Sequence, residues 1–238
     1  MPVSTTVSII LNTTDSDAAI SFNYMENGVV EFMKKNCCWD HYLSVNNERV
    51  TEILLYSVAI IQNISRFFSV KSRCGDSVNW LIPLLSVTKG NIHIHSVMLL
   101  ANMVDANNNA VLINAQGCIN DIIHISNAAV PDMEHKGYHL WELLLAIGKL
   151  AKNDSIRKKL KKCGMLDLLM TLIQKNDDNI QALALNIMLT MILDDDILSF
   201  CHSSSVTKDL RPILESIKDT DDFMLSNNAK SALQIINN

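Results

Sequence analysis

Apolar residues recur along this chain in the order that helices require. Residues 138–151 (YHLWELLLAIGKLA) are apolar on nearly every side, which predicts a helix buried over most of its surface. Residues 118–126 carry isoleucine at positions 119, 122 and 123, on one face of a shorter helix. Because the chain has only 7 Gly and 4 Pro among 238 residues, few positions can end a helix. The pattern predicts an all-α protein.

Similar apolar segments return at a nearly constant spacing. Each follows a glycine, and these glycines, spaced 47, 42 and 47 residues apart, are Gly28, Gly75, Gly117 and Gly164. A fifth copy begins near Ser204, with serine in place of glycine. Glycine accepts the left-handed backbone conformation that lets a chain turn sharply between two helices. A repeat of roughly 40 to 47 residues indicates a stacked helical solenoid.

Each copy predicts a short first helix, a second helix after the glycine, and a long third helix. The second helices are expected at 29–35, 78–85, 118–126, 165–174 and 207–217. The third helices are expected at 48–68, 92–104, 138–151, 179–193 and 223–236. Longer loops at 36–47 and 127–137 account for the two wider spacings. The acidic run 194–196 is expected in a loop, since carboxylates just after a helix oppose its dipole.

This three-helix unit resembles the armadillo repeat. The matching segments are the repeat glycines, the second helices LIPLL and LLMTLI, and the third-helix ends QNIS, ANMV and GKLA. The resemblance covers residues 15–238 and implies a right-handed superhelical solenoid of about five repeats, whose third helices line a concave groove. The repeats are expected at 15–68, 69–104, 105–151, 152–193 and 194–238. Residues 1–14 are interpreted as an N-terminal tail or a partial cap.

The resemblance also implies where a ligand would lie. Armadillo proteins that bind nuclear-localisation signals carry a Trp on the third helix and an Asn four residues later, whose amide holds an extended peptide. No Trp stands at the first of these positions here, so such a receptor is not expected. The Asn position and the position seven residues before it supply the candidate groove residues, which are Asn63, Asn102, Lys149, Tyr56, His95 and Glu142. The alternative is that these residues simply face solvent.

Charge separates the remaining partner classes. The net charge of −5 disfavours nucleic acid, which requires a basic surface. A local basic run, RKKLKK, offers a secondary surface for an acidic partner through Arg157, Lys158 and Lys161, or else is an ordinary solvated helix face. No apolar run is long enough to span a membrane.

The cysteines and histidines do not form a recognisable site. Three of the six cysteines, Cys74, Cys118 and Cys163, each lie beside a repeat glycine. The cysteines are interpreted as small buried side chains in a reducing compartment, which predicts a cytoplasmic protein. The segment 37–41 (CCWDH) and the pairs His93/His95 and His135/His139 lack the further ligands of a metal site. No catalytic motif is present, so neither catalysis nor a cofactor is expected.

Two functions remain open from the sequence. The first is a non-catalytic scaffold that binds a protein or an extended peptide along the groove. The second is a regulatory or oligomerising armadillo segment of a larger signalling protein, for example one that restrains a TIR-type effector domain. The apolar C-terminal segment SALQIINN supports the second, because Leu233 and Ile236 are expected to meet another repeat or domain, or a second copy of the chain.

Overall fold

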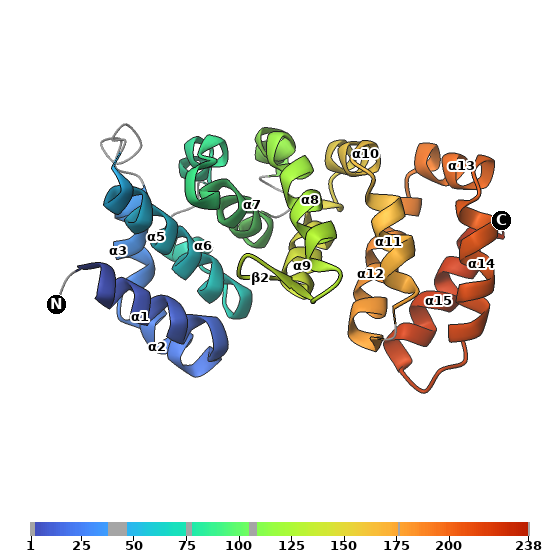
Figure 1. Ribbon diagram of the computed structural model, residues 1–238, viewed down its shortest axis with the longest axis horizontal. Coiled ribbons are helices and arrows are strands. Elements are labelled where there is room, and N and C mark those ends of the chain that lie inside the picture. The colour runs from blue at the N-terminus through green and yellow to red at the C-terminus, as the bar shows by residue number, and fades with distance from the viewer. Residues whose placement is uncertain (1–2, 38–46, 75–77, 105–108, 176, 238) are drawn as a thin grey trace. The chain divides into compact units, whose positions relative to one another are not determined.

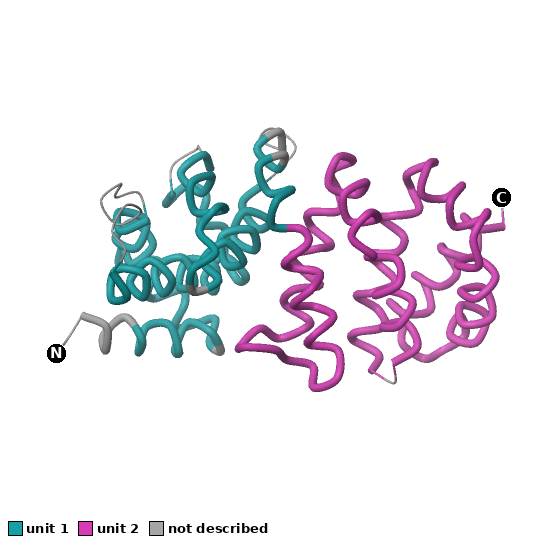
Figure 2. Tube along the Cα trace, turned by 45° about the horizontal axis from the view of Figure 1, so that its top comes forward, with its two compact units in different colours: residues 1–118 teal, residues 119–238 magenta. Residues whose placement is uncertain are grey.

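The computed structural model describes residues 3–37, 47–74, 78–104, 109–175 and 177–237 (Figure 1). The chain divides into two compact units, residues 1–118 and 119–238 (Figure 2). Helices make up both units, with one short hairpin in the second. Within the described ranges, no helix has the length and apolar character needed to cross a membrane.

Unit 1 is organised around the helix α5. Its elements are α1 (Val3–Ser16), α2 (Ala18–Glu26), α3 (Val29–Cys37), α5 (Glu48–Phe67), α6 (Lys71–Cys74), the 3-10 helices η1 (Asn79–Leu81), η2 (Pro83–Ser86) and η3 (Lys89–Asn91), α7 (Ile92–Met103) and the 3-10 helix η4 (Asn109–Cys118). The third helices α5 and α7 pack against each other, and α1 packs along α5 as well. The segment interpreted as a tail or partial cap is therefore helical from residue 3 and contributes to this packing.

Unit 2 is organised around the helix α12. Its elements are α8 (Ile119–Ala129), β1 (Glu134–His135), β2 (Tyr138–His139), α9 (Leu140–Leu150), α10 (Asp154–Lys162), α11 (Met165–Ile173), α12 (Asp178–Ile192), α13 (Asp195–Ser203), α14 (Val206–Ile217) and α15 (Phe223–Ile236). The third helices α9 and α15 both contact α12, and α11 covers α12 from within its own repeat. Three successive third helices thus lie side by side in this unit (Figure 1).

Asp or Asn side chains begin many of the helices. Their carboxylate or amide oxygens accept hydrogen bonds from the first free backbone N–H groups, as at Asp17, Asn47, Asn153, Asp177, Asp194 and Asp222. Such a cap stabilises a helix by about 1 kcal/mol. These residues explain why the helices start so sharply in a chain with few glycines and prolines.

The glycine turns are confirmed at two of the four positions. Gly28 and Gly164 adopt φ of 78° and 84°, the left-handed conformation that lets the second helix turn away from the first. The expected turn at Gly117 is wrong, because Gly117 lies inside η4 and has no positive φ. Gly75 lies outside the described residues. The second helix expected at 78–85 is instead two short 3-10 helices, with Pro83 at the start of η2.

The acidic run at 194–196 is a helix start, and the loop expected there is wrong. Asp194 caps α13, and its Oδ1 accepts hydrogen bonds from the backbone N–H groups of Asp196 and Ile197. Asp195 and Asp196 occupy the first turn, where carboxylates interact favourably with the helix dipole. The three carboxylates interact with the positive N-terminal end of α13 and not only with the negative C-terminal end of α12. The unfavourable interaction that the sequence suggested is therefore offset.

The loop expected at 127–137 is shorter and more ordered than predicted. Helix α8 continues to Ala129, and an antiparallel hairpin pairs Glu134 with His139 and His135 with Tyr138. Gly137, with φ of 81°, lies in the tight turn of this hairpin. Of the other long loop, 36–47, residues 38–46 lie outside the described part of the chain.

The C-terminal helix buries the two apolar residues that were expected to meet another domain. Leu233 is 7% exposed and Ile236 is 2% exposed within unit 2. Helix α15 obtains this cover from α12 and α14. The expectation that these two side chains need an outside partner is therefore wrong.

The two glycines with contrasting backbones allow a matched stability test. We expect Gly164→Ala to lower the free energy of unfolding by about 1 kcal/mol, because alanine must adopt the left-handed conformation. Gly117→Ala is the control, and we expect a change within about 0.5 kcal/mol, since its φ is ordinary. An added Cβ meets no atom within 4 Å at either position, so packing does not confuse the comparison. Urea unfolding measures both, and equal losses would contradict the assignment of the turns.

Candidate functional site

The third helix α7 of unit 1 leaves only two side chains partly exposed. Along α7, every residue from 92 to 103 is buried except His95 and Asn102, which are half-buried. These two positions were predicted to face a groove from the spacing of seven residues. On α5, Tyr56 is half-buried and Asn63 retains only 6% exposure. Asn63 therefore offers a ligand much less surface than Tyr56, His95 or Asn102 does.

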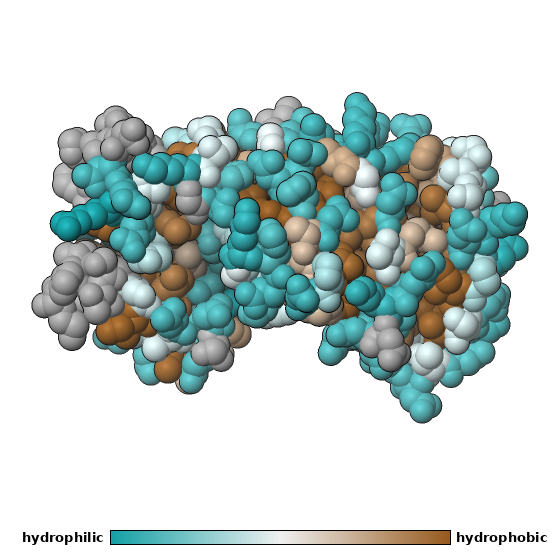
Figure 3. All heavy atoms as spheres, in the orientation of Figure 1, coloured by the Kyte–Doolittle hydropathy of each residue, from teal (hydrophilic) through white to brown (hydrophobic). Residues whose placement is uncertain are grey.

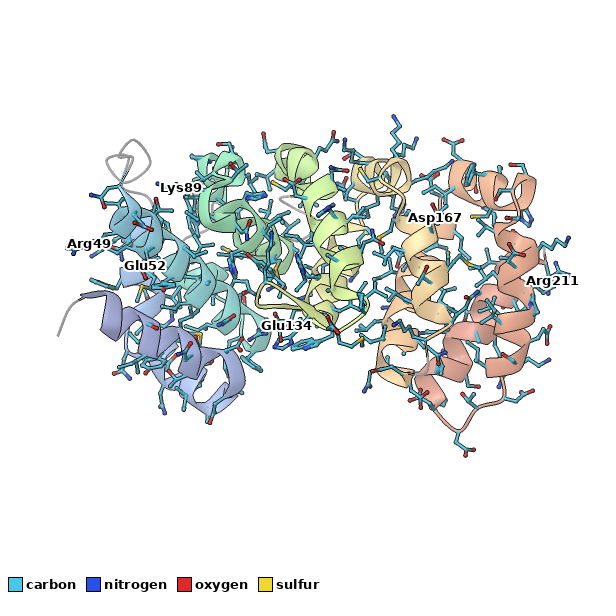
Figure 4. All side chains as sticks on the ribbon, in the orientation of Figure 1. Arg49, Glu52, Lys89, Glu134, Asp167 and Arg211 are labelled. Atoms are coloured by element: carbon cyan, nitrogen blue, oxygen red, sulfur yellow. The ribbon has the colours of Figure 1, made fainter. Side chains whose placement is uncertain are left out.

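Hydrogen bonds within unit 1 already involve several of these groups. The Tyr56 hydroxyl donates to Glu52 Oε1 at 2.8 Å, and this bond, together with burial, raises the pKa of Tyr56. Asn102 Nδ2 donates to Ser65 Oγ at 2.8 Å, which ties α7 to α5. Glu52 and the exposed end of α5 are visible in Figure 4. A ligand at this surface would meet groups whose orientation is already set.

The charged residues at the other end of α5 act on His95. Arg66 Nη2 donates to both the backbone oxygen and Oδ1 of Asp15, each at 2.8 Å. Burial and, to a smaller extent, the positive charge of Arg66 together lower the pKa of His95 to about 4, against a smaller opposing effect of Asp15. His93 also lowers it slightly. His95 is therefore neutral at physiological pH.

The third helix α9 of unit 2 exposes a row that joins the predicted residue Lys149 to two residues that were not among the candidates. Trp141 is 42% exposed, Leu145 is 38% exposed and Lys149 is also exposed. Residues four apart lie on one face of a helix, so these three form a continuous stripe on α9. Burial lowers the pKa of Lys149. Glu142, the predicted groove residue of this repeat, is only 8% exposed and lies beside the row.

Trp141 was missed because of the spacing chosen. The sequence prediction stepped back seven residues from Lys149 and reached Glu142, whereas the exposed row steps back by four residues twice, through Leu145 to Trp141. Both steps keep a residue near one face of a helix, so spacing alone does not separate them. The signal that was available is a large aromatic residue in an otherwise aliphatic helix.

A cavity of about 640 Å³ opens where the third helices of unit 2 begin. We call it the unit 2 cavity. Its apolar wall comes from the hairpin segment, α9, α12 and α15, through Met133, Trp141, Ile180, Ala182, Leu183 and Met224. Ile180, Ala182 and Leu183 come from α12, Trp141 from α9 and Met224 from α15. Most of the apolar wall is therefore contributed by third helices.

The polar part of the unit 2 cavity is acidic. Asp177 and Asp222, which cap α12 and α15, both line it, together with His139, Asn179 and Asn186. Among the described residues that line it, none is Lys or Arg. Asp177 Oδ1 accepts a hydrogen bond from Ile180 N at 3.0 Å, and Asp222 Oδ1 accepts one from Leu225 N at 2.7 Å. These backbone bonds hold the two carboxylates in place.

The predicted secondary basic surface is largely engaged within unit 2. Arg157 forms an ion pair with Asp154, and Lys158 Nζ lies 3.4 Å from Asp196 Oδ2. Lys161 Nζ lies 4.2 Å from the centre of the Phe200 ring. The basic run on α10 therefore faces the acidic start of α13, and two motifs that the sequence left unexplained interact with each other. This arrangement favours a packing role for the run over a separate binding surface.

The histidine and cysteine candidates do not gather into a cluster. Among the residues that the structure describes, no three His, Cys, Asp or Glu side chains are placed to hold one metal ion. Residues 38–41 of the CCWDH segment lie outside that part of the chain.

On the face of the molecule drawn in Figure 3, apolar side chains occur in small groups among polar ones.

Comparisons with known proteins agree with this architecture. No protein-family model matches the chain, and no curated protein matches its sequence. Among solved structures it is similar to the designed armadillo repeat protein YIII(Dq)4CqI, with a TM-score of 0.65 and 16% identity over 98% of this chain and 93% of that one. It is also similar to YIII(Dq.V1)4CPAF, solved in complex with the peptide (KR)4, with a TM-score of 0.60 and 17% identity over 97% and 91% of the two chains.

A third solved structure, of computationally designed armadillo repeat proteins for modular peptide recognition, gives a TM-score of 0.60 and 17% identity over 96% of this chain and 91% of that one. These likenesses confirm the fold that the repeat pattern predicted. The chain has an armadillo-type, all-helical repeat fold.

The lowered pKa of His95 predicts a specific pH dependence. Between pH 6.5 and about 4, the unfolded chain binds a proton at His95 that the folded chain does not bind, so stability falls as pH falls through this window. We expect His95→Gln, which cannot be protonated, to reduce the slope of unfolding free energy against pH there. The control is His124→Gln, on an exposed position of α8. Equal slopes for wild type and His95→Gln would show that His95 titrates normally.

The contact between Lys161 and Phe200 predicts a measurable coupling. A double-mutant cycle with Lys161→Met and Phe200→Leu should give a coupling energy of about 0.5 to 1 kcal/mol, because the cation lies over the ring face. Thermal or urea unfolding of the four proteins measures it. A control cycle with Lys162→Met and Phe200→Leu should give none. A coupling near zero in the first cycle would mean that α10 and α13 pack without this interaction.

Proposed function

We propose that this chain is a binding scaffold that holds a protein segment or an extended peptide along its third helices. The observation that carries the proposal is the unit 2 cavity, which lies on the third-helix surface and leaves Trp141 and Met224 partly uncovered. Exposed large apolar side chains beside a cavity are typical of interaction sites. The complex of a similar designed protein with (KR)4 supports a peptide as the class of ligand.

The proposal includes the six predicted groove residues. Tyr56, His95 and Asn102 form the accessible line in unit 1, and Lys149 extends the exposed row of α9 in unit 2. In this proposal, amides such as that of Asn102 bond to the peptide backbone, and Tyr56 and His95 contact side chains. Asn63 and Glu142, which are mostly buried, contribute at the edge of the contact or by holding their neighbours in place.

The remaining parts of the proposal follow from composition and burial. We place the protein in the cytoplasm, because four of its described cysteines are buried as small apolar side chains. We assign it no catalytic activity of its own, because the sequence carries no recognisable catalytic motif. The negative net charge makes a protein a better partner than nucleic acid.

One observation favours self-association as a second function. Phe223 is 80% exposed and Leu193 is 67% exposed, both on or beside third helices of unit 2. Burying such side chains against a second copy would stabilise a dimer. Sedimentation equilibrium distinguishes the two functions, because a dimer that Phe223→Ser dissociates would support self-association, and a monomer at every concentration would exclude it.

Selection of displayed peptides tests the proposed function. A phage library of random peptides should enrich binders on the immobilised chain, and these binders should weaken by about tenfold or more on the Tyr56→Ala/Asn102→Ala or Leu145→Ala/Lys149→Ala variants, which lose groove contacts. The matched control is Asn120→Ala/His124→Ala, two exposed residues on the second helix α8. Fluorescence anisotropy with synthetic copies of the selected peptides gives the affinities.

Two results would contradict the function. In the first, no peptide is enriched above an unrelated protein. In the second, the selected peptides bind both groove variants as tightly as the wild type and weaken only on the α8 control. Circular dichroism of each variant excludes loss of fold as the cause of weaker binding.

A further inference from the structure

We infer that the unit 2 cavity selects a peptide segment in which a large apolar side chain lies next to a Lys or Arg. The apolar side chain enters between α12 and the hairpin, and the neighbouring cation meets the carboxylates of Asp177 and Asp222. This inference rests on the proposed function, because it names the kind of segment that the third-helix surface holds.

The wall of the cavity suits one large apolar side chain. Met133, Trp141 and Met224 come from three different elements, and Leu183 from α12 lies among them. Met224 is 64% exposed without a ligand, so filling the cavity would remove apolar surface from water. Methionine side chains adapt to the shape of what they contact, and tryptophan provides a large rigid face. The wall therefore favours an apolar anchor such as Leu, Met or Phe.

The rim of the cavity suits a positive charge. Asp177 and Asp222 line it, and no Lys or Arg among the lining residues neutralises them. Within the described residues, neither carboxylate forms an ion pair. Two further exposed carboxylates lie next to them in the chain: Asp178 follows Asp177, and Asp221 precedes Asp222. A segment with acidic residues beside its anchor would be repelled here, whereas Lys or Arg would be attracted.

The helix starts at this rim do not form an anion site. The free N–H groups at the start of a helix attract anions in many proteins. Here the side chains of Asp177 and Asp222 already accept from those groups, at Ile180 N and Leu225 N. The two carboxylates therefore occupy the place that a bound anion would take, and a ligand at this rim meets their negative charge.

The hairpin gives the cavity a fixed side. Leu140 N donates to the Met133 backbone oxygen at 2.9 Å, which closes the hairpin at the start of α9. Glu134, labelled in Figure 4, pairs with His139 across the strands. Its carboxylate lies 3.6 Å from His139 Nδ1. Met133 and His139 are consequently held beside Trp141. The inserted segment between the second and third helices thus supplies part of the binding wall.

Four fluorescein-labelled peptides of equal length test the inference. They share Gly-Ser flanks and differ in the centre, which reads Lys-Leu-Lys, Lys-Ala-Lys, Ser-Leu-Ser or Glu-Leu-Glu. We expect the Lys-Leu-Lys peptide to bind at least about tenfold more tightly than each of the others, since only it supplies both the anchor and the charge. Anisotropy titrations at low and at physiological salt measure the affinities, and added salt should weaken this peptide most.

Matched variants place the binding in the cavity. Asp177→Asn/Asp222→Asn removes both charges but keeps good helix caps, because Asn caps a helix as well as Asp does. It should weaken the Lys-Leu-Lys peptide about fivefold or more and leave the Ser-Leu-Ser peptide unchanged. Met224→Ala should weaken the Lys-Leu-Lys and the Ser-Leu-Ser peptides alike. The control is Asp167→Asn, an exposed acid in the first turn of α11 (Figure 4), which should change neither.

The outcomes separate this inference from the function on which it rests. Equal binding of all four peptides, or binding of Lys-Leu-Lys that the cavity variants do not change, would overturn the inference. If peptides from the phage selection bind the third helices but none of the four does, the function stands and the inference is wrong. If selection also fails, both are wrong.

Discussion

The third helix of each repeat has more apolar surface than its own repeat can cover, and the rest of the structure depends on this constraint. In unit 1, α7 leaves only His95 and Asn102 partly exposed between positions 92 and 103. In unit 2, α12 is covered by α11 from its own repeat and by α9 and α15 from the neighbouring ones. Burial by neighbours stabilises the stack, and it restricts the accessible side chains to a narrow row. A ligand bound to this surface would contact mainly the side chains of that row.

Polar residues at the helix ends cap helices and also place charge at the unit 2 cavity. Asp177 and Asp222 begin two of the third helices, and their position as caps brings two fixed carboxylates to the rim of one cavity. Asp194 begins α13 in the same way and directs the following acids toward the basic helix α10. Helix capping thus places the two carboxylates of the unit 2 cavity and the acidic start of α13.

Much of the fold could be predicted from the sequence, because helix periodicity and glycine turns are local properties. The last third helix was predicted at 223–236 and is observed at Phe223–Ile236, and α12 is displaced by one residue from its prediction. Gly28 and Gly164 turn as expected. The candidate site was predicted less completely. The six groove residues remain a prediction, and Trp141 was missed because steps of four and of seven residues keep to nearly the same helix face.

The sequence by itself determined that the chain is a stack of three-helix repeats, because the spacing of apolar residues along a chain is enough to indicate helices and their repetition. Only the tertiary structure decided which polar motifs serve packing and which remain open to a ligand. The basic run and the acidic run lie far apart in sequence and meet because α10 packs near α13. The cavity likewise needs residues from the hairpin, α9, α12 and α15 together. Contacts between distant segments depend on how the repeats stack, and no local pattern of residues encodes them.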